Sequence, residues 1–430
     1  MDPARPHSSL LTVATLSLLA LCAACSREAA PPAATGNETG TAAAASSATP
    51  AAGGPLETRE RNGKDFKPAF PEQTRAPGVK SNFALDVSVV AKNLNGAWSF
   101  EFLPDQRVLV TEREGNLRII GKDGKVSAPL KGLPKVYFEG QGGLLDVALD
   151  PQFATNRTLY WSYAEPRKGG NGTALAKGVL SADESAVEQV KVIFHQMPTY
   201  NSNYHFGSRI VFAPDGKLFL TLGERSNPES RVHSQDLNSD FGKVVRLNPD
   251  GSVPNDNPFV GRSDAKPEIW SYGHRNVQAA TLDKQGQLWT IEHGPRGGDE
   301  LNHPQAGLNY GWPVITYGIE YDGPKIGEGI TQKEGMEQPV YYWDPVIAPS
   351  GMIVYDGSMF PEWQGNIFVG GMQSMKLVRL QLQGGKVTGE EWLLQDRGRR
   401  IRDVKQGPDG AIYVITEAPD GELLKISRKR

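Results

Sequence analysis

The stretch Ile210-Val-Phe-Ala-Pro-Asp-Gly-Lys-Leu-Phe-Leu-Thr221 holds a turn between two apolar runs. Pro, Asp and Gly favour a reversal of the chain, because Pro fixes φ and Gly tolerates the positive φ of tight turns. Alternating apolar residues are typical of strands that are buried on one face. The stretch therefore predicts a strand, a tight turn and a second strand.

This unit recurs along the chain at spacings of roughly 45 to 80 residues. The other instances are Phe102–Thr111, Ala148–Tyr163, Thr281–Thr290, Ile353–Val369 and Val404–Val414. Repeated strand units separated by loops of variable length are typical of propeller blades. We therefore expect an all-β fold, a six-bladed β-propeller over residues 79–430, with a pair of β-sandwiches as the alternative.

Composition and charge exclude several classes of protein. The 430 residues carry a formal net charge of −3 without a strongly basic block, so the chain lacks the electrostatic footprint of a nucleic-acid-binding protein. Its two cysteines, Cys22 and Cys25, both lie near the N-terminus. The predicted propeller thus has no disulfide, no cysteine-ligated zinc and no catalytic thiol.

The N-terminal part is typical of an exported protein. An apolar run over Leu10–Ala24 is short for a membrane span and predicts a signal peptide over residues 1–25. Leu21-Cys22-Ala23-Ala24-Cys25 resembles a lipobox, which predicts a lipid on Cys25; signal cleavage without a lipid is the alternative. Residues 26–78 are rich in Ala, Pro and Thr and predict a disordered tether. We expect the protein to be located at the periplasmic face of the outer membrane, which it contacts only through the lipid anchor, or in the soluble periplasm.

Loops of a propeller gather around one end of its axis, so polar residues in loops are candidates for a site. Five clusters stand out, at residues 140–145, 203–209, 270–276, 292–300 with 309–313, and 399–403. Arg400 and Arg402 are two positions apart, so on a strand both side chains point to the same face and could bind an anion through their guanidinium groups. The alternative is that both arginines are solvated at the surface. The glycine-rich run at 294–300 offers carbonyl and carboxylate oxygens to a hard cation such as calcium, or is a plain flexible turn.

Three of these clusters resemble one known family. Tyr204-His-Phe-Gly-Ser-Arg209, Glu292-His-Gly-Pro-Arg-Gly-Gly-Asp-Glu300 and Arg400-Ile-Arg-Asp403 are together similar to motifs of the soluble glucose and aldose sugar dehydrogenases that use pyrroloquinoline quinone (PQQ). This is the glucose/sorbosone dehydrogenase family, and the resemblance extends over residues 82–427. It implies PQQ- and calcium-dependent oxidation of aldoses at C1 to lactones. The electrons would pass to an external acceptor, a cytochrome or a quinone, and the enzyme would be a monomer or a dimer.

The resemblance also implies roles for individual residues. His205 matches the general base. Cofactor contacts are implied for Gln141, Arg275, Asn276, Gln373, Arg400 and Arg402, with Arg275 also acting in catalysis. Gln141, Glu224 and Trp343 match positions beside the sugar. The carbonyls of Gly294 and Pro295 match ligands of the cofactor's calcium, and Glu300 with the Tyr310 carbonyl matches a second, structural calcium site.

Two positions distinguish this chain within the family. Glu224 follows Gly223 where glucose dehydrogenases have Asp, which favours the aldose branch. Gln373 stands where the family has a lysine that binds the cofactor, so one cationic contact is lost. Lys376 is the candidate to replace that contact, although its strand position argues against it. A binding propeller without catalysis and a calcium-dependent lactonase are the alternative functions; a hydrolase needs no paired arginines.

Overall fold

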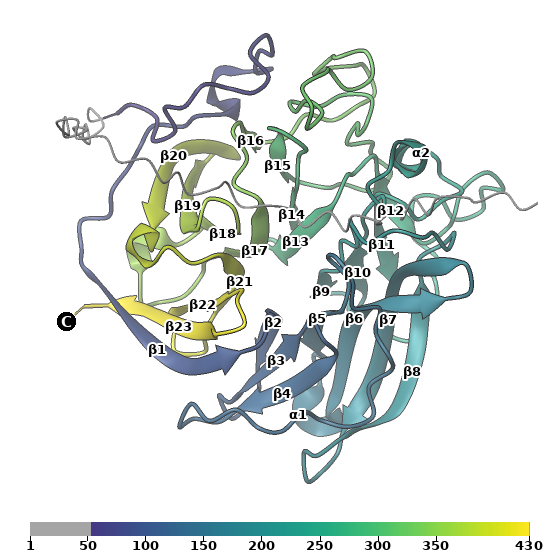
Figure 1. Ribbon diagram of the computed structural model, residues 1–430, viewed down its shortest axis with the longest axis vertical. Helices are drawn as coiled ribbons and strands as arrows, with labels where there is room; N and C mark the ends of the chain where they lie inside the picture. The colour runs from purple at the N-terminus through teal and green to yellow at the C-terminus, as the bar shows by residue number, and fades with distance from the viewer. Residues whose placement is uncertain (1–52, 430) are drawn as a thin grey trace, which may run out of the picture. The chain divides into compact units, whose positions relative to one another are not determined.

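The computed structural model describes residues 53–429, which lie in one compact unit. Six antiparallel sheets stand around a common axis as the blades of a β-propeller, so the predicted fold is confirmed (Figure 1). None of the helices in this part of the chain is long and apolar enough to cross a bilayer. The predicted signal peptide, Cys25 and residues 26–52 of the predicted tether lie outside the described residues.

The strands follow one another blade by blade. The first blade has β2 (Ala97–Phe102), β3 (Val108–Glu112) and β4 (Asn116–Ile120); the second has β5 (Leu144–Leu149), β6 (Thr158–Arg167), β7 (Gly170–Leu180) and β8 (Val187–His195). The third has β9 (Ile210–Phe212), β10 (Leu218–Thr221), β11 (Lys243–Leu247) and β12 (Ile269–Tyr272); the fourth has β13 (Val277–Leu282), β14 (Leu288–Glu292), β15 (Asp299–Asn302) and β16 (Tyr341–Trp343). The fifth has β17 (Pro349–Val354), β18 (Ile367–Gly371), β19 (Lys376–Gln383) and β20 (Lys386–Leu393).

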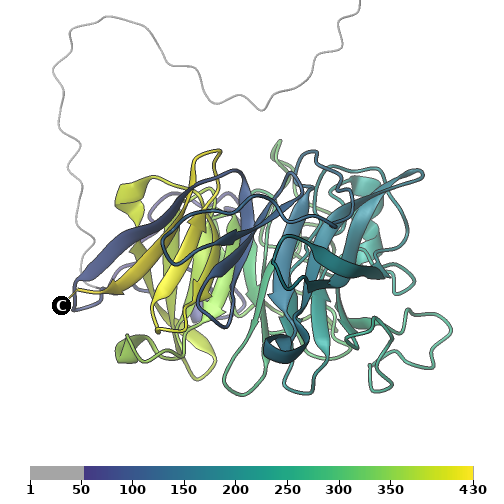
Figure 2. The ribbon, with the colours of Figure 1, turned by 90° about the horizontal axis from the view of Figure 1, so that it is seen from below.

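The sixth blade closes the ring. It combines β21 (Ile401–Gln406), β22 (Ile412–Thr416) and β23 (Gly421–Arg428) with β1 (Leu85–Leu94), which comes from the start of the fold and pairs with β23 (Figures 1 and 2). Both ends of the propeller are thereby held in one sheet, and a closed ring leaves few free strand edges. The short helices α1 (Phe153–Asn156), α2 (Pro228–Arg231) and four 3₁₀ turns, Pro71–Gln73, Val232–Ser234, Pro361–Trp363 and Gln395–Arg397, lie in the connections.

The hairpin predicted at residues 210–221 is β9 and β10, with Phe212 opposite Leu218. Its turn is closed by two backbone hydrogen bonds, from the Ala213 amide to the Lys217 carbonyl and from the Gly216 amide to the Ala213 carbonyl, and Gly216 adopts a φ of 79°. β9 is also the innermost strand of its blade. The innermost strands β2, β5, β9, β13, β17 and β21 contact one another around the axis, while the apolar core fills the space between blades.

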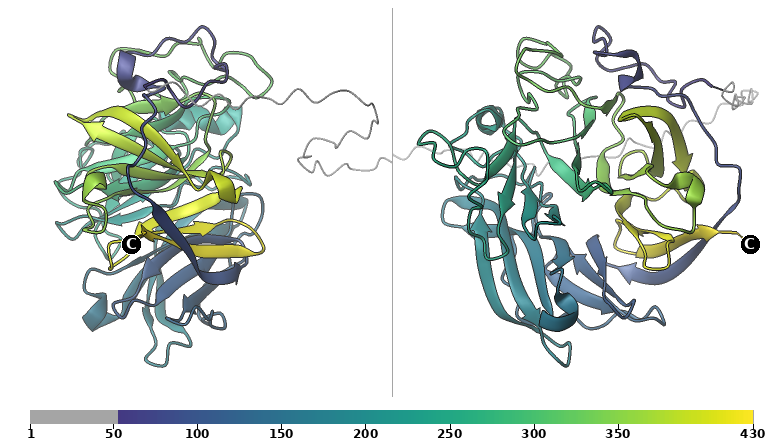
Figure 3. Two further views of the ribbon diagram at one scale, coloured as in Figure 1. Left: turned by 90° about the vertical axis from the view of Figure 1, so that its left-hand side faces the viewer. Right: turned by 180° about the vertical axis from the view of Figure 1, so that it is seen from behind.

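Residues 53–78 differ from the prediction of a disordered tether. Phe66 and Ala76 are buried, and Gln73 is fully buried, where its side chain accepts a hydrogen bond from Tyr317. The segment runs beside β16 and β20 (Figures 1 and 3). The described fold therefore includes residues 53–78, and its order comes from contacts with distant blades that local composition does not reveal.

Candidate active site

The loops that lead into the innermost strands meet at one end of the axis, here called the mouth. Gln141 precedes β5, His205 precedes β9, and Asn276 precedes β13. Direct hydrogen bonds join these loops: the His205 amide donates to Gln141 Oε1 (2.9 Å), and the Gly207 amide donates to Asn276 Oδ1 (3.0 Å). The structure therefore brings together residues that lie more than a hundred positions apart in the sequence.

His205 and Glu224 form a buried pair at the mouth. Nδ1 of His205 lies 3.1 Å from Oε2 of Glu224, but Nδ1 has no partner with hydrogen-bond geometry. His205 has a φ of 53°, and a Cβ at Gly223 would lie only 2.1 Å from the His205 carbonyl oxygen. Only glycine fits at position 223, so the Gly-Glu sequence is what lets the carboxylate of Glu224 reach the imidazole.

The electrostatics of the pair favour a neutral histidine beside a carboxylate. Burial lowers the pKa of His205 because it disfavours the imidazolium; Glu224 opposes this effect and Arg275 adds to it. Burial alone would raise the pKa of Glu224, but His205 and Arg275 outweigh it, and the pKa of Glu224 is lowered. A neutral imidazole beside an anion is poised to accept a proton.

Arg275 is buried at the mouth without a salt bridge in the described part of the chain. Its Nη1 donates to the carbonyls of His293 (3.1 Å) and Gly294 (2.9 Å), and its Nη2 donates to the Tyr321 hydroxyl (3.3 Å). Its Nε is buried without a partner. The guanidinium also lies 5.3 Å from the centre of the Trp312 ring. A buried cation with a free donor fits a ligand that carries negative charge.

Arg402 is the second buried cation of the mouth and is 8% exposed. Its guanidinium lies 4.8 Å from the centre of the Trp98 ring, and its nearest polar contact is Sδ of Met372 at 3.9 Å. Burial lowers the pKa of Arg402 to about 10, an effect that Glu417 only partly offsets. Arg400, in contrast, is exposed and bound to Glu417 at 3.0 Å. The predicted arginine pair thus consists of one buried and one solvated cation.

A loop over residues 294–298 carries the predicted calcium ligands Gly294 and Pro295. The Gly294 amide donates to Oδ1 of the fully buried Asp299 (2.8 Å). The other oxygen of Asp299 accepts the amides of Ile347 (2.7 Å) and Ala348 (2.9 Å), so one carboxylate joins two loops of the mouth. The Gly294 carbonyl faces the Arg275 guanidinium, and a carbonyl that accepts a cationic donor can also bind a metal ion.

The residues of the predicted second calcium site share one neighbourhood. The carboxylate of Glu300 lies beside that of Glu292; burial, followed by this repulsion, raises the pKa of Glu300. Nearby, Oδ1 of the buried Asn302 has no partner. The Tyr310 ring stacks on His274, whose Nδ1 lies 2.9 Å from Oε1 of Glu292. Carboxylate and amide oxygens without a cationic partner are the ligands that a hard cation such as calcium takes.

Trp343 does not lie where it was predicted. Its side chain is buried, packs edge-to-face on Tyr341, and belongs to the core that includes Ala279 and Ile347. The reason is the alternation of β16, which places Trp343 and Tyr341 on the same, core-facing side. The assignment of Trp343 to the sugar site is therefore corrected.

Gln373 is exposed in the turn between β18 and β19, next to the Met372 that contacts Arg402. Lys376 points elsewhere: its Nζ lies 3.1 Å from the centre of the Trp392 ring on the outermost strand of the blade. Burial lowers the pKa of Lys376 to about 8. The structure agrees with the expectation that Lys376 does not replace the missing lysine.

Four residues of the mouth had no assigned role in the sequence prediction: Trp98, His293, Trp312 and Tyr321. Nε2 of His293 lies 2.5 Å from the Pro349 carbonyl, and burial lowers the pKa of His293 to about 3, so the ring is neutral. Tyr321 is 69% exposed although its hydroxyl contacts Arg275. His293 and Trp312 lie inside clusters that the sequence singled out, which was a usable signal; Trp98 and Tyr321 approach only through tertiary packing.

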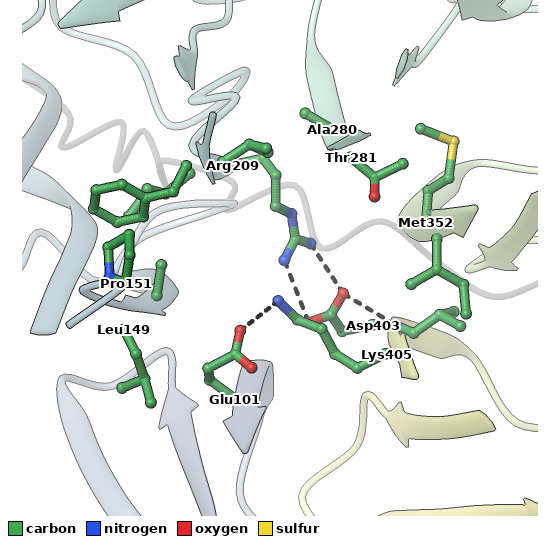
Figure 4. A pocket seen from close by; sticks show the side chains of 15 residues that line it. Glu101, Leu149, Pro151, Arg209, Ala280, Thr281, Met352, Asp403 and Lys405 are labelled. Carbon is green, nitrogen blue, oxygen red and sulfur yellow. Dashed lines mark hydrogen bonds and ion pairs between the residues drawn. The ribbon is translucent and has the colours of Figure 1, made fainter. Parts of the chain in front are cut away.

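A second polar cluster lies further along the innermost strands. Arg209 binds Asp146 (2.8 Å) and Asp403 (3.2 Å), and the Ser99 hydroxyl lies within hydrogen-bond distance of both carboxylates. Beyond it, a cavity of about 380 Å³ opens along the axis, lined among others by Lys405, which binds Glu101 at 3.0 Å (Figure 4). Every charge drawn in this cluster has an opposite partner, unlike the cations of the mouth.

Fold and site together define a β-propeller whose mouth can bind an anionic ligand beside a potential general base. The profile of the glucose/sorbosone dehydrogenase family matches residues 94–425. Aldose sugar dehydrogenase YliI of Escherichia coli K12 is 46% identical over 347 residues, which cover 80% of this chain and 93% of that protein. The chain therefore belongs to the glucose/sorbosone dehydrogenase family, as its motifs predicted.

Solved structures give the same result. The apo form of soluble aldose sugar dehydrogenase from E. coli is 45% identical, with a TM-score of 0.78, and covers 80% of this chain. The PQQ-bound aldose sugar dehydrogenase from Streptomyces coelicolor is 27% identical, with a TM-score of 0.65, and covers 81% of this chain. Both of those chains are covered completely.

Proposed function

We propose that this protein is a quinoprotein dehydrogenase that oxidises aldose sugars at C1 to lactones with bound PQQ and calcium, and passes the electrons to an external acceptor. The observation that carries the proposal is the set of unpaired polar groups at the mouth. Arg402 is buried without a carboxylate within salt-bridge distance, and Nε of Arg275 is buried without a partner in the described chain. Isolated buried charges are costly, so these groups are expected to be paired in the working protein.

The residues present fit PQQ, which carries three carboxylates and a quinone. Arg402 and Arg275 would hold its acidic and quinone oxygens, with the solvated Arg400 at the rim. Asn276 and Gln141 are placed beside them by their bonds to the Gly207 and His205 amides. When bound, PQQ supplies the chemistry of hydride acceptance, which protein side chains lack. The amide of Gln373 keeps a hydrogen-bond donor but adds no charge.

His205 is the group that moves the proton. As a neutral imidazole it would take the proton of the sugar's C1 hydroxyl while the hydride leaves C1 for the acceptor that bound PQQ would supply, and the C1–O bond becomes the carbonyl of the lactone. Glu224 stabilises the imidazolium that forms, because its carboxylate lies 3.1 Å from Nδ1. Burial of this pair keeps water from competing for the proton.

Calcium would be bound at two places in this fold. Among residues 53–429, no group of three His, Cys, Asp or Glu side chains gathers as a metal site, so a metal at the mouth depends on backbone carbonyls and on the cofactor itself. The carbonyls of Gly294 and Pro295 would bind it there. Glu300 and the Tyr310 carbonyl would hold a second ion, which would relieve the repulsion between Glu300 and Glu292.

Reconstitution tests the proposal. Purified protein freed of metal with a chelator is mixed with PQQ and calcium, and dye reduction is followed with a panel of aldoses while the lactone is identified. We expect activity only when PQQ and calcium are both present. PQQ binding without oxidation of any aldose would instead indicate a binding propeller, and lactone hydrolysis with calcium alone would indicate a hydrolase.

Export and anchoring are proposed from the N-terminal sequence alone. The apolar run ends in small residues before Cys25, which supports cleavage there and a lipid on that cysteine. Mass spectrometry of the mature N-terminus tests this: a diacylated or triacylated Cys25 is expected. Retention of Met1, or an unmodified start elsewhere, would contradict the anchor without affecting the enzyme.

A further inference from the structure

Residues 53–78, here called the strap, lie outside the part of the chain that the family profile matches. The strap nevertheless packs against the blade that carries Gly294 and Pro295. We propose that the strap is a positioning element that holds the 294–298 loop in shape for binding calcium. The inference rests on the proposed function, because it concerns the metal of that site.

The first connection runs through Asp344, which is 3% exposed. Its Oδ1 accepts the amide of Asn62 (2.9 Å) and the Asn62 side chain (2.8 Å), and its Oδ2 accepts the amide of Gly63 (2.9 Å). The strap thus supplies three donors to one buried carboxylate. Charge-assisted bonds of this kind are stronger than neutral ones and fix the carboxylate in one orientation.

Asp344 in turn shapes the loop. A Cβ added to Gly297, which has a φ of 87°, would lie 2.7 Å from Oδ1 of Asp344, so the carboxylate packs directly against the loop backbone. Gly297 then packs on Gly294, where an added Cβ would lie 2.2 Å from the Gly297 carbonyl oxygen. Arg296 also donates to Oδ1 of Asn62 (3.1 Å). The contacts therefore form an unbroken path from the strap to a proposed calcium ligand.

A second connection reaches Pro295 through aromatic rings. Phe66 of the strap is buried with Tyr317 and Tyr342, whose rings stack with centres 3.9 Å apart. Gly318, next to Tyr317, is so close to Pro295 that an added Cβ would lie 2.7 Å from Cδ of the proline. Both proposed calcium-binding carbonyls thus belong to residues whose surroundings the strap helps to fix.

Preorganisation explains why this matters for a metal ion. A carbonyl on a glycine-rich loop is free to turn away, and ordering that loop at the moment of binding costs conformational entropy. A strap that orders the loop in advance removes this cost. The strap should therefore act on calcium affinity as well as on the stability of the fold.

The test compares Asn62→Ala and the double variant Asn62→Ala/Phe66→Ala with wild type. The matched control is Glu72→Gln, which removes the exposed strap contact to Lys386 (3.3 Å) far along the strap from Asp344. Calcium affinity is measured by calorimetry in the presence of PQQ, and melting temperatures are measured in chelator and in saturating calcium. We expect Kd for calcium to rise about tenfold in the double variant, less in Asn62→Ala, and not at all in Glu72→Gln.

The outcomes separate the inference from the proposed function. The inference is overturned if wild type binds calcium with PQQ and the strap variants bind calcium equally well but melt earlier in chelator. The strap would then only stabilise the fold. A wild type that binds no calcium would overturn the inference together with the metal part of the proposed function. If the double variant fails to fold, Asn62→Ala alone decides.

Discussion

Two buried arginines lie over the same indole ring of Trp98 and differ in one respect. The guanidinium of Arg209 is 4.7 Å from the ring centre and that of Arg402 is 4.8 Å. Arg209 is bound by Asp146 and Asp403, which outweigh burial and raise the pKa of Arg209, whereas the pKa of Arg402 is lowered to about 10. Burial alone therefore does not mark a functional cation; the absence of a protein partner does.

The same contrast separates the mouth from the second polar cluster around Arg209, here called the inner cluster. In the inner cluster, Arg209 and Lys405 each have a carboxylate within 3.3 Å (Figure 4). At the mouth, Arg275 and Arg402 have none within salt-bridge distance in the described chain. The inner cluster is thus a structural element of the propeller, and the mouth is a site prepared for a ligand.

The largest effect that would sharpen this comparison is expected for His205→Ala. The variant should bind PQQ normally and lose about 10²–10⁴-fold in turnover, because a positioned general base contributes on that order. Stopped-flow reduction of bound PQQ by sugar checks it. Asn203→Ala, a neighbour in the same loop, shows what a nonspecific change in this loop costs; turnover of His205→Ala close to that of wild type would remove His205 from the chemistry.

The next effect concerns stability without ligand. Arg209→Ala leaves Asp146 and Asp403 buried and unpaired, so the free energy of unfolding should fall by about 3–5 kcal/mol. Arg402→Met replaces an unpaired cation by an apolar side chain and should change it by less than about 1 kcal/mol or stabilise the protein. Denaturant unfolding of the PQQ-free proteins in chelator measures both. Equal losses in the two variants would contradict the comparison.

A smaller effect is expected for Gln373→Lys. A cation added in the turn beside Met372 should restore one charge-assisted bond to the cofactor and tighten PQQ binding about tenfold. Gln383→Lys places the same charge at an exposed position of the same blade and should leave the affinity unchanged. If both variants bind PQQ equally, position 373 does not face the cofactor.

The smallest effect concerns the pH at which activity falls. Burial holds the pKa of His205 below 6.5, so the acid limb of kcat/KM should lie below that pH. Glu224 raises this pKa, so Glu224→Gln should move the limb further toward acid. Stability should decline as pH falls below 6.5, since the unfolded chain then binds a proton that the folded protein does not. A limb above pH 6.5 in wild type would contradict a neutral buried base.

The sequence predicted the propeller because turn chemistry and strand alternation are local, and each blade repeats them. The mouth was predictable where its residues share a motif, as with His205 or Gly294. Two errors have one cause. Trp343 shares a core cluster with Ala279 and Val378, and the strap binds Asp344; these partners lie far away in the chain, and neither composition nor a single motif reports such contacts.

The most direct test of the account is the affinity of the unloaded protein for PQQ, measured by calorimetry with calcium present. Wild type should bind one PQQ, and Arg402→Met should bind it about 10- to 100-fold more weakly, because a charge-assisted bond to a buried cation is lost. Arg400→Met, whose cation is solvated and already paired with Glu417, should lose much less. Equal PQQ affinity in wild type and Arg402→Met would contradict the claim that the unpaired cation of the mouth awaits the cofactor.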